Sequence, residues 1–460
     1  MGQMLTCVSP IDGSVFAERE ALDLETARAE VARLRAAQGA WAARPLAERI
    51  ELVMAGVAAV GAMNDEIVPE LAHMMGRPVR YGGEFGGFNE RASHMAAIAE
   101  ESLADIEVGE DASFKRYIKR VPHGVVFVVA PWNYPYMTAI NTVAPALIAG
   151  NVVALKHATQ TLLVGERMAA AFHSAGVPED VFANLYLGHD VTSALIAEKA
   201  FDFVNFTGSV GGGQAMERAA AGTFTGVGTE LGGKDPGYVM EDADLDAAVE
   251  TLIDGAMFNS GQCCCGIERI YVHESRFDAF VDKAVAIVKG YKLGNPLDPD
   301  TTMGPMAHER FAQEVRMQIA EAVAEGATPH IERFAEDDNG AYLSPQILTN
   351  VTHEMRVMRD ESFGPVVGIM KVASDEEAIA LMNDSEFGLT ASLWTQDLER
   401  AARIGDQLET GTVFMNRADY LDPGLCWTGC KNTGRGGGLS IIGYHNLTRP
   451  KSYHMKKVTS

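Results

Sequence analysis

The stretch GVVFVVAPWNYPYMTAINTVAPALIAGNVVAL, residues 124–155, contains no charged side chain. Its length alone would suit a membrane span. However, Pro131, Pro135, Pro145 and Gly150 interrupt it, and prolines break a helix. A run of β-branched residues that ends at a proline is typical of a buried strand. We therefore predict a strand over 124–129, a loop, a helix near 136–149 and a strand over 151–155, which together form one buried βαβ unit.

Helix-period stretches precede this unit, and strands and helices continue to alternate after it. This pattern predicts an α/β protein with a parallel sheet covered on both faces. Further strands are expected in FANLYL (182–187) and DFVNFTG (202–208), and also at 267–272 and 411–416. Helical periodicity is expected at 24–41, 45–76, 84–106, 160–175, 190–199, 210–221, 243–257, 274–290 and 307–325.

Composition limits the possible functions. The chain has 460 residues, enough for two or three domains. Its net charge of -24 and its lack of a basic run argue against binding to nucleic acid or to an anionic membrane. Six cysteines and no recognisable signal peptide favour a reducing compartment, and we expect a cytoplasmic location.

The tail LTRPKSYHMKKV is typical of an edge strand that needs a partner, which a homodimer or homotetramer would provide.

Three adjacent cysteines lie in FNSGQCCCGIER, residues 258–269. Zinc ligation uses cysteine pairs spaced a few residues apart, so we predict no metal here. A disulfide between neighbours would be strained. A nucleophilic cysteine presented by the SGQ turn remains possible, as do three small core residues. The local sequence alone does not decide between these two interpretations.

Other motifs carry polar groups next to glycines or prolines. TELGGK places Glu230 at a strand end, PWNYP places Asn133 on a rigid loop, and ESFGP sets Glu361 beside an aromatic ring. Together with AGNVVALK, FTGS and the cysteine stretch, these motifs resemble the aldehyde dehydrogenase superfamily in order and spacing. The resemblance runs from about residue 8 to the end, and Glu230 and Cys264 are separated by 34 positions.

This resemblance implies the catalytic roles. Cys264 matches the nucleophile that attacks the aldehyde carbonyl, and Asn133 with the Cys264 backbone N–H would hold the oxyanion. Hydride transfer would then leave a thioester, and Glu230 matches the base that activates water to hydrolyse it. Cys263 and Cys265 are expected to point the other way if the segment is extended, with Cys265 used for packing.

The resemblance also implies a site for NAD or NADP. The residues that match it are Trp132, Lys156, Thr159, Ser209, Glu361 and Phe363. Relatives often carry a glutamate at the position of Thr159, where a carboxylate would repel a ribose 2′-phosphate. A neutral threonine does not repel it, so we expect NADP to be tolerated.

The expected substrate is a small aldehyde, held in a pocket that departs from the family pattern. Its expected lining is Tyr134, Thr138, Asn141, Phe258, Cys263, Asp419 and Thr428. These side chains predict a polar pocket. Arg417 could pair with a carboxylate on a semialdehyde, or Asp419 could simply neutralise it. The glycine-rich motif appears as TGRGGG (433–438) without the family's glutamate, so Glu230 would act without that second carboxylate.

The resemblance further implies a Rossmann-type cofactor domain, an α/β catalytic domain and a small β oligomerisation element. We assign the cofactor domain to 1–107 and 123–228, the catalytic domain to 229–430, and the oligomerisation element to 108–122 and 431–460. Two alternatives remain open. One is a coenzyme A-acylating aldehyde dehydrogenase, whose relatives generally lack the glutamate of TELGGK, and the other is a non-catalytic protein that keeps the fold.

Overall fold

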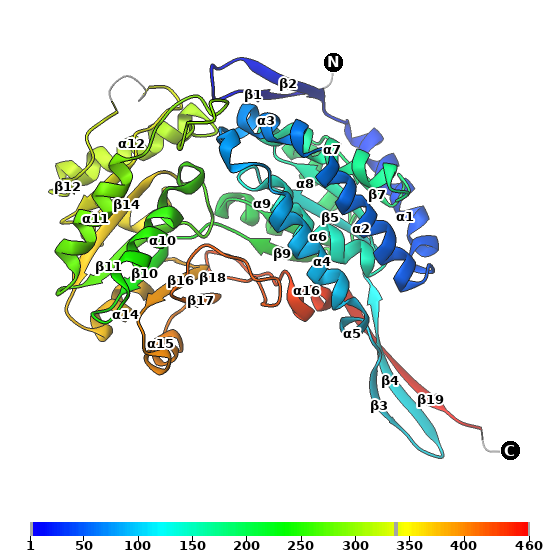
Figure 1. Ribbon diagram of the computed structural model, residues 1–460. Helices are drawn as coiled ribbons and strands as arrows, with labels where there is room; N and C mark the ends of the chain where they lie inside the picture. Colours follow the sequence, from blue (N-terminus) through cyan, green and yellow to red (C-terminus); the bar gives the residue numbers. More distant parts are fainter. Residues whose placement is uncertain (1–2, 335–338, 459–460) are drawn as a thin grey trace.

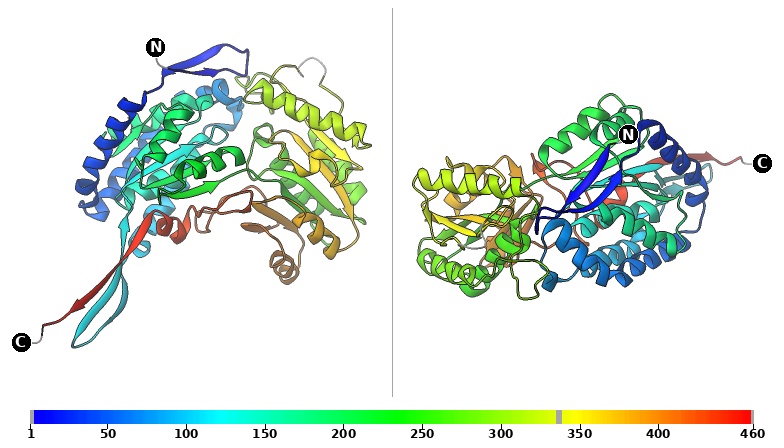
Figure 2. Two further views of the ribbon diagram at one scale, coloured as in Figure 1. Left: turned by 180° about the vertical axis from the view of Figure 1, so that it is seen from behind. Right: turned by 90° about the horizontal axis from the view of Figure 1, so that it is seen from above.

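The computed structural model describes residues 3–334 and 339–458. Two α/β lobes lie side by side, and a narrow arm that carries the C-terminus projects from one of them (Figure 1). The two further views show the same division, with the N-terminal hairpin lying across the top of the molecule (Figure 2). That hairpin consists of β1 (Met4–Val8) and β2 (Val15–Glu20).

The predicted βαβ unit forms the centre of the first lobe. It consists of β5 (Val125–Ala130), α6 (Pro135–Ile148) and β6 (Val152–His157), and every residue of both strands is buried. Its sheet is parallel throughout, in the order β7-β6-β5-β8-β9. The remaining strands are β7 (Phe182–Asn184), β8 (Phe203–Thr207) and β9 (Gly226–Glu230), and the following helices are α7 (Leu162–Ser174), α8 (His189–Ala197) and α9 (Val210–Ala220).

The N-terminal helices of this lobe are shorter than their periodicity predicts. Met63 and Ile98 have φ/ψ of −92/6 and −90/0, and each separates two helices where one was expected. The apolar spacing continues across each break, because spacing reports which face is buried and not whether the backbone bends. The helices are α1 (Leu24–Ala42), α2 (Leu46–Ala62), α3 (Asn64–Met75), α4 (Phe85–Ala97) and α5 (Ala99–Ser102).

The second lobe has its own sheet, in the order β12-β13-β14-β11-β10-β16-β17. All its pairings are parallel except that between β12 and β13. The strands are β10 (Asp235–Val239), β11 (Ile267–His273), β12 (Thr328–Pro329), β13 (Gln346–Thr349), β14 (Val366–Val372), β16 (Thr390–Trp394) and β17 (Thr412–Met415). The helices are α10 (Leu245–Met257), α11 (Phe277–Lys289), α12 (Glu309–Ala324), α13 (Arg356–Arg359), α14 (Asp375–Asn383) and α15 (Leu398–Gly405). These two lobes confirm the predicted α/β class.

The arm is a three-stranded antiparallel sheet in the order β19-β4-β3. Its strands are β3 (Ile106–Glu110), β4 (Phe114–Pro122) and β19 (Thr448–Lys456). The tail strand β19 is an edge strand, as expected, and it pairs with β4 along its whole length, so one of its two edges has its partner in the same chain. After β17 the chain returns to the arm through β18 (Cys430–Lys431), paired with β15 (Phe387–Gly388), and α16 (Ser440–Asn446).

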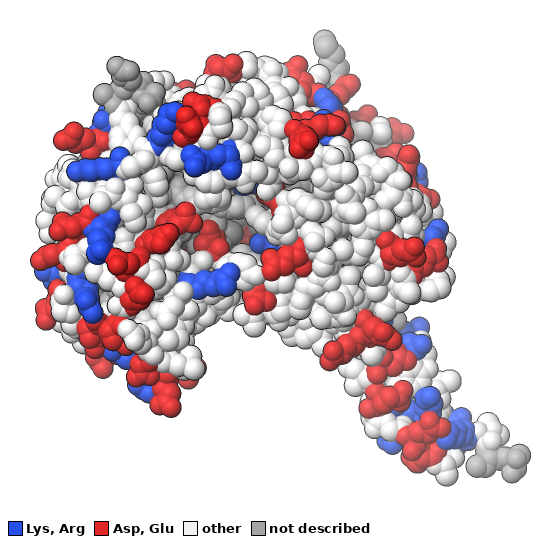
Figure 3. All heavy atoms as spheres, viewed as in Figure 1, with Lys and Arg blue, Asp and Glu red and all other residues white. Residues whose placement is uncertain are grey.

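Acidic and basic side chains are interspersed over the face shown in Figure 3, with no basic patch on that face. Among the described residues, no helix has both the length and the hydropathy needed to cross a bilayer.

Candidate active site

The PWNYP loop is fixed by a buried ion pair that the sequence reasoning missed. Arg77 Nη1 donates to Glu84 Oε1 at 2.6 Å, and Arg77 Nη2 donates to the carbonyl oxygen of Asn133 at 2.7 Å. The Asn133 side-chain amide is thereby held toward the cysteine segment, where its Nδ2 donates to the carbonyl of Gln262 at 3.3 Å. A buried pair of this kind positions a loop more than it stabilises the fold.

The three cysteines lie in a turn between α10 and β11. Asn259 and Ser260 have φ of 55° and 57°, and these left-handed residues reverse the chain after α10. Gly261 follows at φ 70°, and a Cβ there would lie 2.2 Å from the carbonyl oxygen of Gly364. Only glycine allows this approach, because it lacks the Cβ that would collide.

All three cysteine sulfurs point into one small volume. They lie within 4.8 Å of one another, and the Sγ atoms of Cys263 and Cys265 are 3.6 Å apart. The expectation that the flanking side chains point away from Cys264 is therefore wrong, because the segment is turned and not extended. The sequence argument that adjacent cysteines cannot face one ion does not hold for this turn.

Hydrogen bonding singles out Cys264 as the thiol that ionises first. The flanking thiols lower the pKa of Cys264 well below its ordinary value, while the pKa values of Cys263 and Cys265 are raised. Asp419 Oδ1 accepts from the thiols of Cys263 and Cys265 at 3.2 and 3.0 Å. Burial raises the pKa of Asp419 to about 6. Because a thiolate is the nucleophilic form of cysteine, Cys264 is the best placed of the three to attack an electrophile.

Glu230 ends β9 close to this thiol. It is buried, and Thr207 Oγ1 donates to its Oε2 at 3.4 Å. Burial, followed by the nearby charge of Cys264, raises the pKa of Glu230 to about 7. A carboxylate with such a pKa can act as a general base near neutral pH. Gly438 lies against it, since a Cβ there would stand 2.9 Å from Glu230 Oε1.

A second buried cation, Arg91 on α4, also faces this region, and the sequence reasoning missed it. Its Nη1 donates to the carbonyl of Met137 at 3.0 Å and to Asn141 Oδ1 at 3.4 Å. Among the described residues, its Nε and Nη2 have no hydrogen-bond partner. Burial lowers its pKa, whereas nearby acidic groups, including Glu230 and the cysteines, act in the opposite direction. The available signal was its position on the buried face of an amphipathic helix, where an arginine is unusual.

The ESFGP loop is held by another buried ion pair. Lys234 Nζ lies 2.5 Å from Glu268 Oε2, and this carboxylate also accepts from the backbone N–H groups of Ser362 and Phe363 at 2.8 Å. Glu361 accepts from the Gly233 N–H at 3.0 Å, and burial raises its pKa to about 8. The adjoining Gly232 must lack a side chain, because a Cβ would lie 2.3 Å from that carboxylate.

The groups expected at the cofactor site fit a dinucleotide. The Lys156 ammonium is buried, its pKa is lowered to about 8, and its hydrogen bond to the carbonyl of His157 is long, at 3.4 Å. Ser209 caps the N-terminus of α9, which favours a phosphate group, and Thr159 begins the short turn η2 (Thr159–Thr161). The Lys156 ammonium and the Glu361 carboxylate thus retain capacity for ribose hydroxyls.

Aromatic rings lie beside the ESFGP loop, at the expected cofactor site. The Trp132 ring stacks on Phe311 with centroids 5.3 Å apart and meets Phe363 edge-on at 5.4 Å. Phe363 has a left-handed φ of 48°, and its backbone N–H donates to Glu268 Oε1 at 2.8 Å. Phe311 on α12 was not predicted, because it comes from a helix without a recognisable motif.

The predicted pocket residues separate into groups. Tyr134 lies under the Arg77 guanidinium at 4.8 Å and near Cys263 and Asp419, so these three predicted residues border the nucleophile. The other predicted residues have different neighbours. The Phe258 ring packs against Tyr81 with centroids 4.9 Å apart, and Thr138 Oγ1 donates to the carbonyl of Tyr134 at 2.7 Å. Asn141 and Thr428 line a cavity of about 320 Å³, together with Gly436, Gly437 and Gly438.

Arg417, the expected carboxylate partner, is exposed. Its guanidinium lies 3.6 Å from the ring centroid of Tyr420. Asp419 bonds to the cysteine thiols instead of neutralising it. Of these two arginines, Arg91 is therefore the one that lies near Cys264 and Glu230.

Comparisons with known proteins agree with this geometry. A sequence model described as "Aldehyde dehydrogenase family" matches residues 2–453. A succinate-semialdehyde dehydrogenase, NADP(+), of Mycolicibacterium paratuberculosis is 36% identical over 361 residues, which cover 78% of this chain and 76% of the relative. The solved structure of Gox0499 matches with a TM-score of 0.93 and 33% identity, covering 99% of this chain and 100% of that one. An NAD+ complex of an aldehyde dehydrogenase from Bacillus cereus has a TM-score of 0.94 and 29% identity, with coverages of 99% and 93%. The chain belongs to the aldehyde dehydrogenase family and is an enzyme that oxidises an aldehyde with NAD or NADP.

Proposed function

We propose that the substrate is a short aldehyde bearing a carboxylate at its far end, of the size of succinate semialdehyde. The observation that carries this proposal is Arg91, a buried guanidinium near Cys264 and Glu230 with two nitrogens free of protein partners among the described residues. A guanidinium fork matches a carboxylate with two parallel hydrogen bonds. The M. paratuberculosis relative, which is named for succinate semialdehyde, supports the same choice.

In the proposed mechanism, the Cys264 thiolate attacks the aldehyde carbon, and the Asn133 amide with the Cys264 backbone N–H stabilises the oxyanion. The bound nicotinamide supplies the acceptor for the hydride that leaves this carbon. Glu230 then removes a proton from water, which attacks the resulting Cys264 thioester and releases the acid. The Arg77–Glu84 pair keeps Asn133 in place throughout.

We propose water, and not coenzyme A, as the acyl acceptor, because Glu230 is present with a pKa of about 7. Incubating the enzyme with aldehyde, cofactor and coenzyme A, followed by mass spectrometry, tests this choice. Free acid is expected in both the presence and the absence of coenzyme A. An acyl-coenzyme A product would overturn the assignment.

For the cofactor, we propose that NADP is accepted alongside NAD, since Thr159 carries no charge that would repel a 2′-phosphate. The relative named with NADP supports this. Steady-state kcat/KM with each cofactor measures the preference. A preference for NAD above about a hundredfold, roughly 2.7 kcal/mol, would exclude it.

The substrate proposal is tested with two aldehydes of equal chain length, succinate semialdehyde and butanal. Arg91→Met should lower kcat/KM for succinate semialdehyde by about a hundredfold, because the carboxylate loses a buried, charged partner. Butanal should change by less than about threefold, since it has no carboxylate to lose.

Arg417→Met is the matched control, because it removes an equivalent charge from the exposed residue that the sequence favoured. It should leave both substrates nearly unchanged. A selective loss in Arg417→Met with none in Arg91→Met would reverse the assignment.

We also propose that the arm joins subunits into a homodimer or homotetramer. The arm leaves apolar side chains exposed to solvent, namely Ile106 and Val108 on β3 and Met455 on β19. In addition, the outer edges of β3 and β19 have no partner strand among the described residues, so both could pair with another subunit. Light scattering should give a multiple of the chain mass, and Val108→Lys should reduce it. A wild-type mass of one chain would reject the proposal.

The six cysteines are all free thiols in the described structure, which suits the proposed location in a reducing cytoplasm.

A further inference from the structure

We propose that Cys263, Cys264, Cys265 and Asp419 form a binding site for one thiophilic divalent cation, such as Zn²⁺ or Cd²⁺, and that this cation blocks the nucleophile. The site would act as a metal-sensitive switch on the enzyme, independent of which aldehyde it oxidises. Its basis is the convergence of three sulfurs and one carboxylate oxygen at the cysteine turn.

The sulfur positions match a tetrahedral site. A Zn–S bond of about 2.3 Å places two sulfurs on one zinc ion about 3.8 Å apart. The Sγ atoms of Cys263 and Cys265 are already 3.6 Å apart. The sulfur of Cys264 lies within 4.8 Å of both, so a modest change in side-chain torsion completes the set. Three thiolates are the donors that zinc and cadmium prefer.

Asp419 supplies the fourth donor from another segment of the chain. Its Oδ1 is 3.2 Å from the sulfur of Cys263 and 3.0 Å from that of Cys265, where it now accepts their two S–H hydrogen bonds. A cation bound among these atoms takes the place of the two thiol protons, which pass to the solvent. The carboxylate oxygen is then free to bind the cation. The site therefore has four ligands and no requirement for water.

The surroundings favour a preformed site. The left-handed residues Asn259 and Ser260 and the tightly packed Gly261 fix the turn. Arg91 carries the positive charge that offsets the excess negative charge of three thiolates and a carboxylate. Cys264 is partly exposed, which leaves a route from solvent to the sulfurs. Because the cation and the aldehyde need the same Cys264 sulfur, each should exclude the other.

Titration of the reduced enzyme with Cd²⁺ tests the site directly. We expect one Cd²⁺ per chain, a thiolate-to-cadmium charge-transfer band in the ultraviolet, and a parallel loss of dehydrogenase activity that a chelator reverses. Prior alkylation of Cys264 should weaken the band. The spectroscopic readout does not depend on knowing the physiological aldehyde.

Substitutions of the proposed metal-binding residues show where the ion binds. Cys263→Ser, Cys265→Ser and Asp419→Asn should each weaken Cd²⁺ binding by about tenfold or more, measured against each variant's own activity and band. Cys430→Ser, which removes a free thiol on β18 outside the site, should leave Cd²⁺ affinity unchanged. Circular dichroism checks that each variant is folded, and Asp419→Asn keeps the test valid if a cysteine variant fails to fold.

Two results would overturn the proposal. The first is a Cd²⁺ affinity that is the same in the wild type, Cys263→Ser, Cys265→Ser and Asp419→Asn, which would place the ion on Cys264 alone or elsewhere. The second is the absence of any charge-transfer band at Cd²⁺ concentrations that inhibit the enzyme.

Discussion

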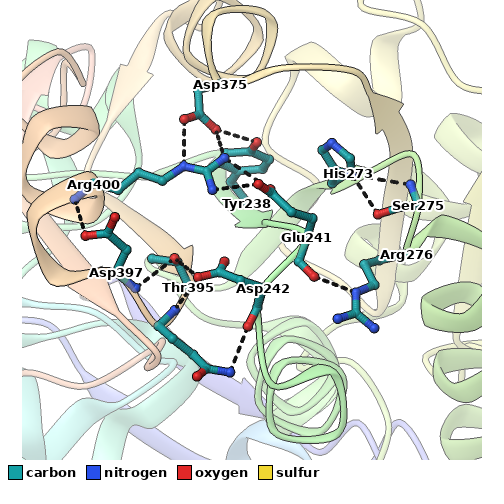
Figure 4. Close-up of polar contacts among 11 residues, drawn as sticks. Tyr238, Glu241, Asp242, His273, Ser275, Arg276, Asp375, Thr395, Asp397 and Arg400 are labelled. Atoms are coloured by element: carbon teal, nitrogen blue, oxygen red, sulfur yellow. Dashed lines mark hydrogen bonds and ion pairs between the residues drawn. The ribbon is translucent and has the colours of Figure 1, made fainter.

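Two clusters of acidic residues in this protein contain similar side chains, but the pKa values of the carboxyl groups are lowered in one and raised in the other. In the second lobe, Arg400 contacts both Asp375 and Glu241, and the hydroxyl of Tyr238 also donates to Asp375 at 2.8 Å (Figure 4). The Arg400 guanidinium and these hydrogen bonds hold the pKa values of Asp375 and Glu241 below their ordinary values. Each charge has a partner, so the cluster links α14, α15 and the end of β10.

The active-site cluster leaves its carboxylates without such compensation. Among the described residues, no lysine or arginine forms an ion pair with Glu230 or Asp419, and burial raises both pKa values. Satisfied charges stabilise structure, whereas buried and incompletely compensated groups can change protonation during a reaction. The difference lies in the partners and the burial, not in the residue types.

Removing the nucleophile should have the largest effect. Cys264→Ser is expected to lower turnover on the order of 10⁴-fold or more, because a neutral hydroxyl replaces the thiolate. Single-turnover assays of NAD(P)H formation measure this loss. Cys263→Ser and Cys265→Ser are the matched comparisons and should retain most of the turnover, and a near-total loss in either would contradict the assignment of Cys264.

Glu230→Gln should separate the two halves of the reaction. The burst of NAD(P)H should persist, while steady-state turnover should fall by about 10²–10⁴-fold, because the acyl enzyme no longer has its base. In the wild type, only the ionised carboxylate accepts a proton, so deacylation should increase as the pH rises through about 7. Stopped-flow measurements across pH test both points, and the absence of a burst in the variant would place Glu230 before hydride transfer.

A smaller effect is expected from Gly438→Ala. The added Cβ would stand 2.9 Å from Glu230 Oε1, so the end of this flexible side chain must move. We expect deacylation to slow by about tenfold with little change in the free energy of unfolding, because a misplaced general base loses most of its contribution. Gly13→Ala, where a Cβ would meet no atom within 4 Å although its φ of 76° adds some strain, is the control for backbone effects. Equal deacylation rates in the wild type and Gly438→Ala would show that Glu230 tolerates the crowding.

The Arg400 cluster should give the smallest effect on activity. Arg400→Met is expected to lower the free energy of unfolding by about 1 kcal/mol, a typical value for a partly exposed ion pair, and to leave kcat unchanged. Because the folded state lowers the pKa values of Asp375 and Glu241, their stabilisation is present at neutral pH. It should disappear as the pH falls through those lowered values. Denaturant unfolding of both proteins at several pH values measures this, and an unfolding difference that grows in acid would contradict it.

Much of the fold was predictable because its signals are local. The uncharged run at 124–155 fixed the central βαβ unit, and alternating apolar runs identified the parallel strands on either side. Helix breaks at Met63 and Ile98 were not predictable, since the apolar spacing continues across them. The pairing register of β19 against β4 was not predictable either, because the two strands lie far apart in the sequence. The domain boundaries remain predictions.

The sequence by itself determined the family, the likeness of Cys264, Glu230 and Asn133 to its catalytic residues, and the use of NAD or NADP, because these depend on motifs whose order and spacing can be read directly. Only the tertiary structure decided what surrounds them. It brought Asp419 to the cysteines, Arg77 to the Asn133 loop and Arg91 toward the nucleophile. Each of these contacts joins segments far apart in the chain, and the protonation of a buried group depends on such neighbours and on the loss of water that only folding produces.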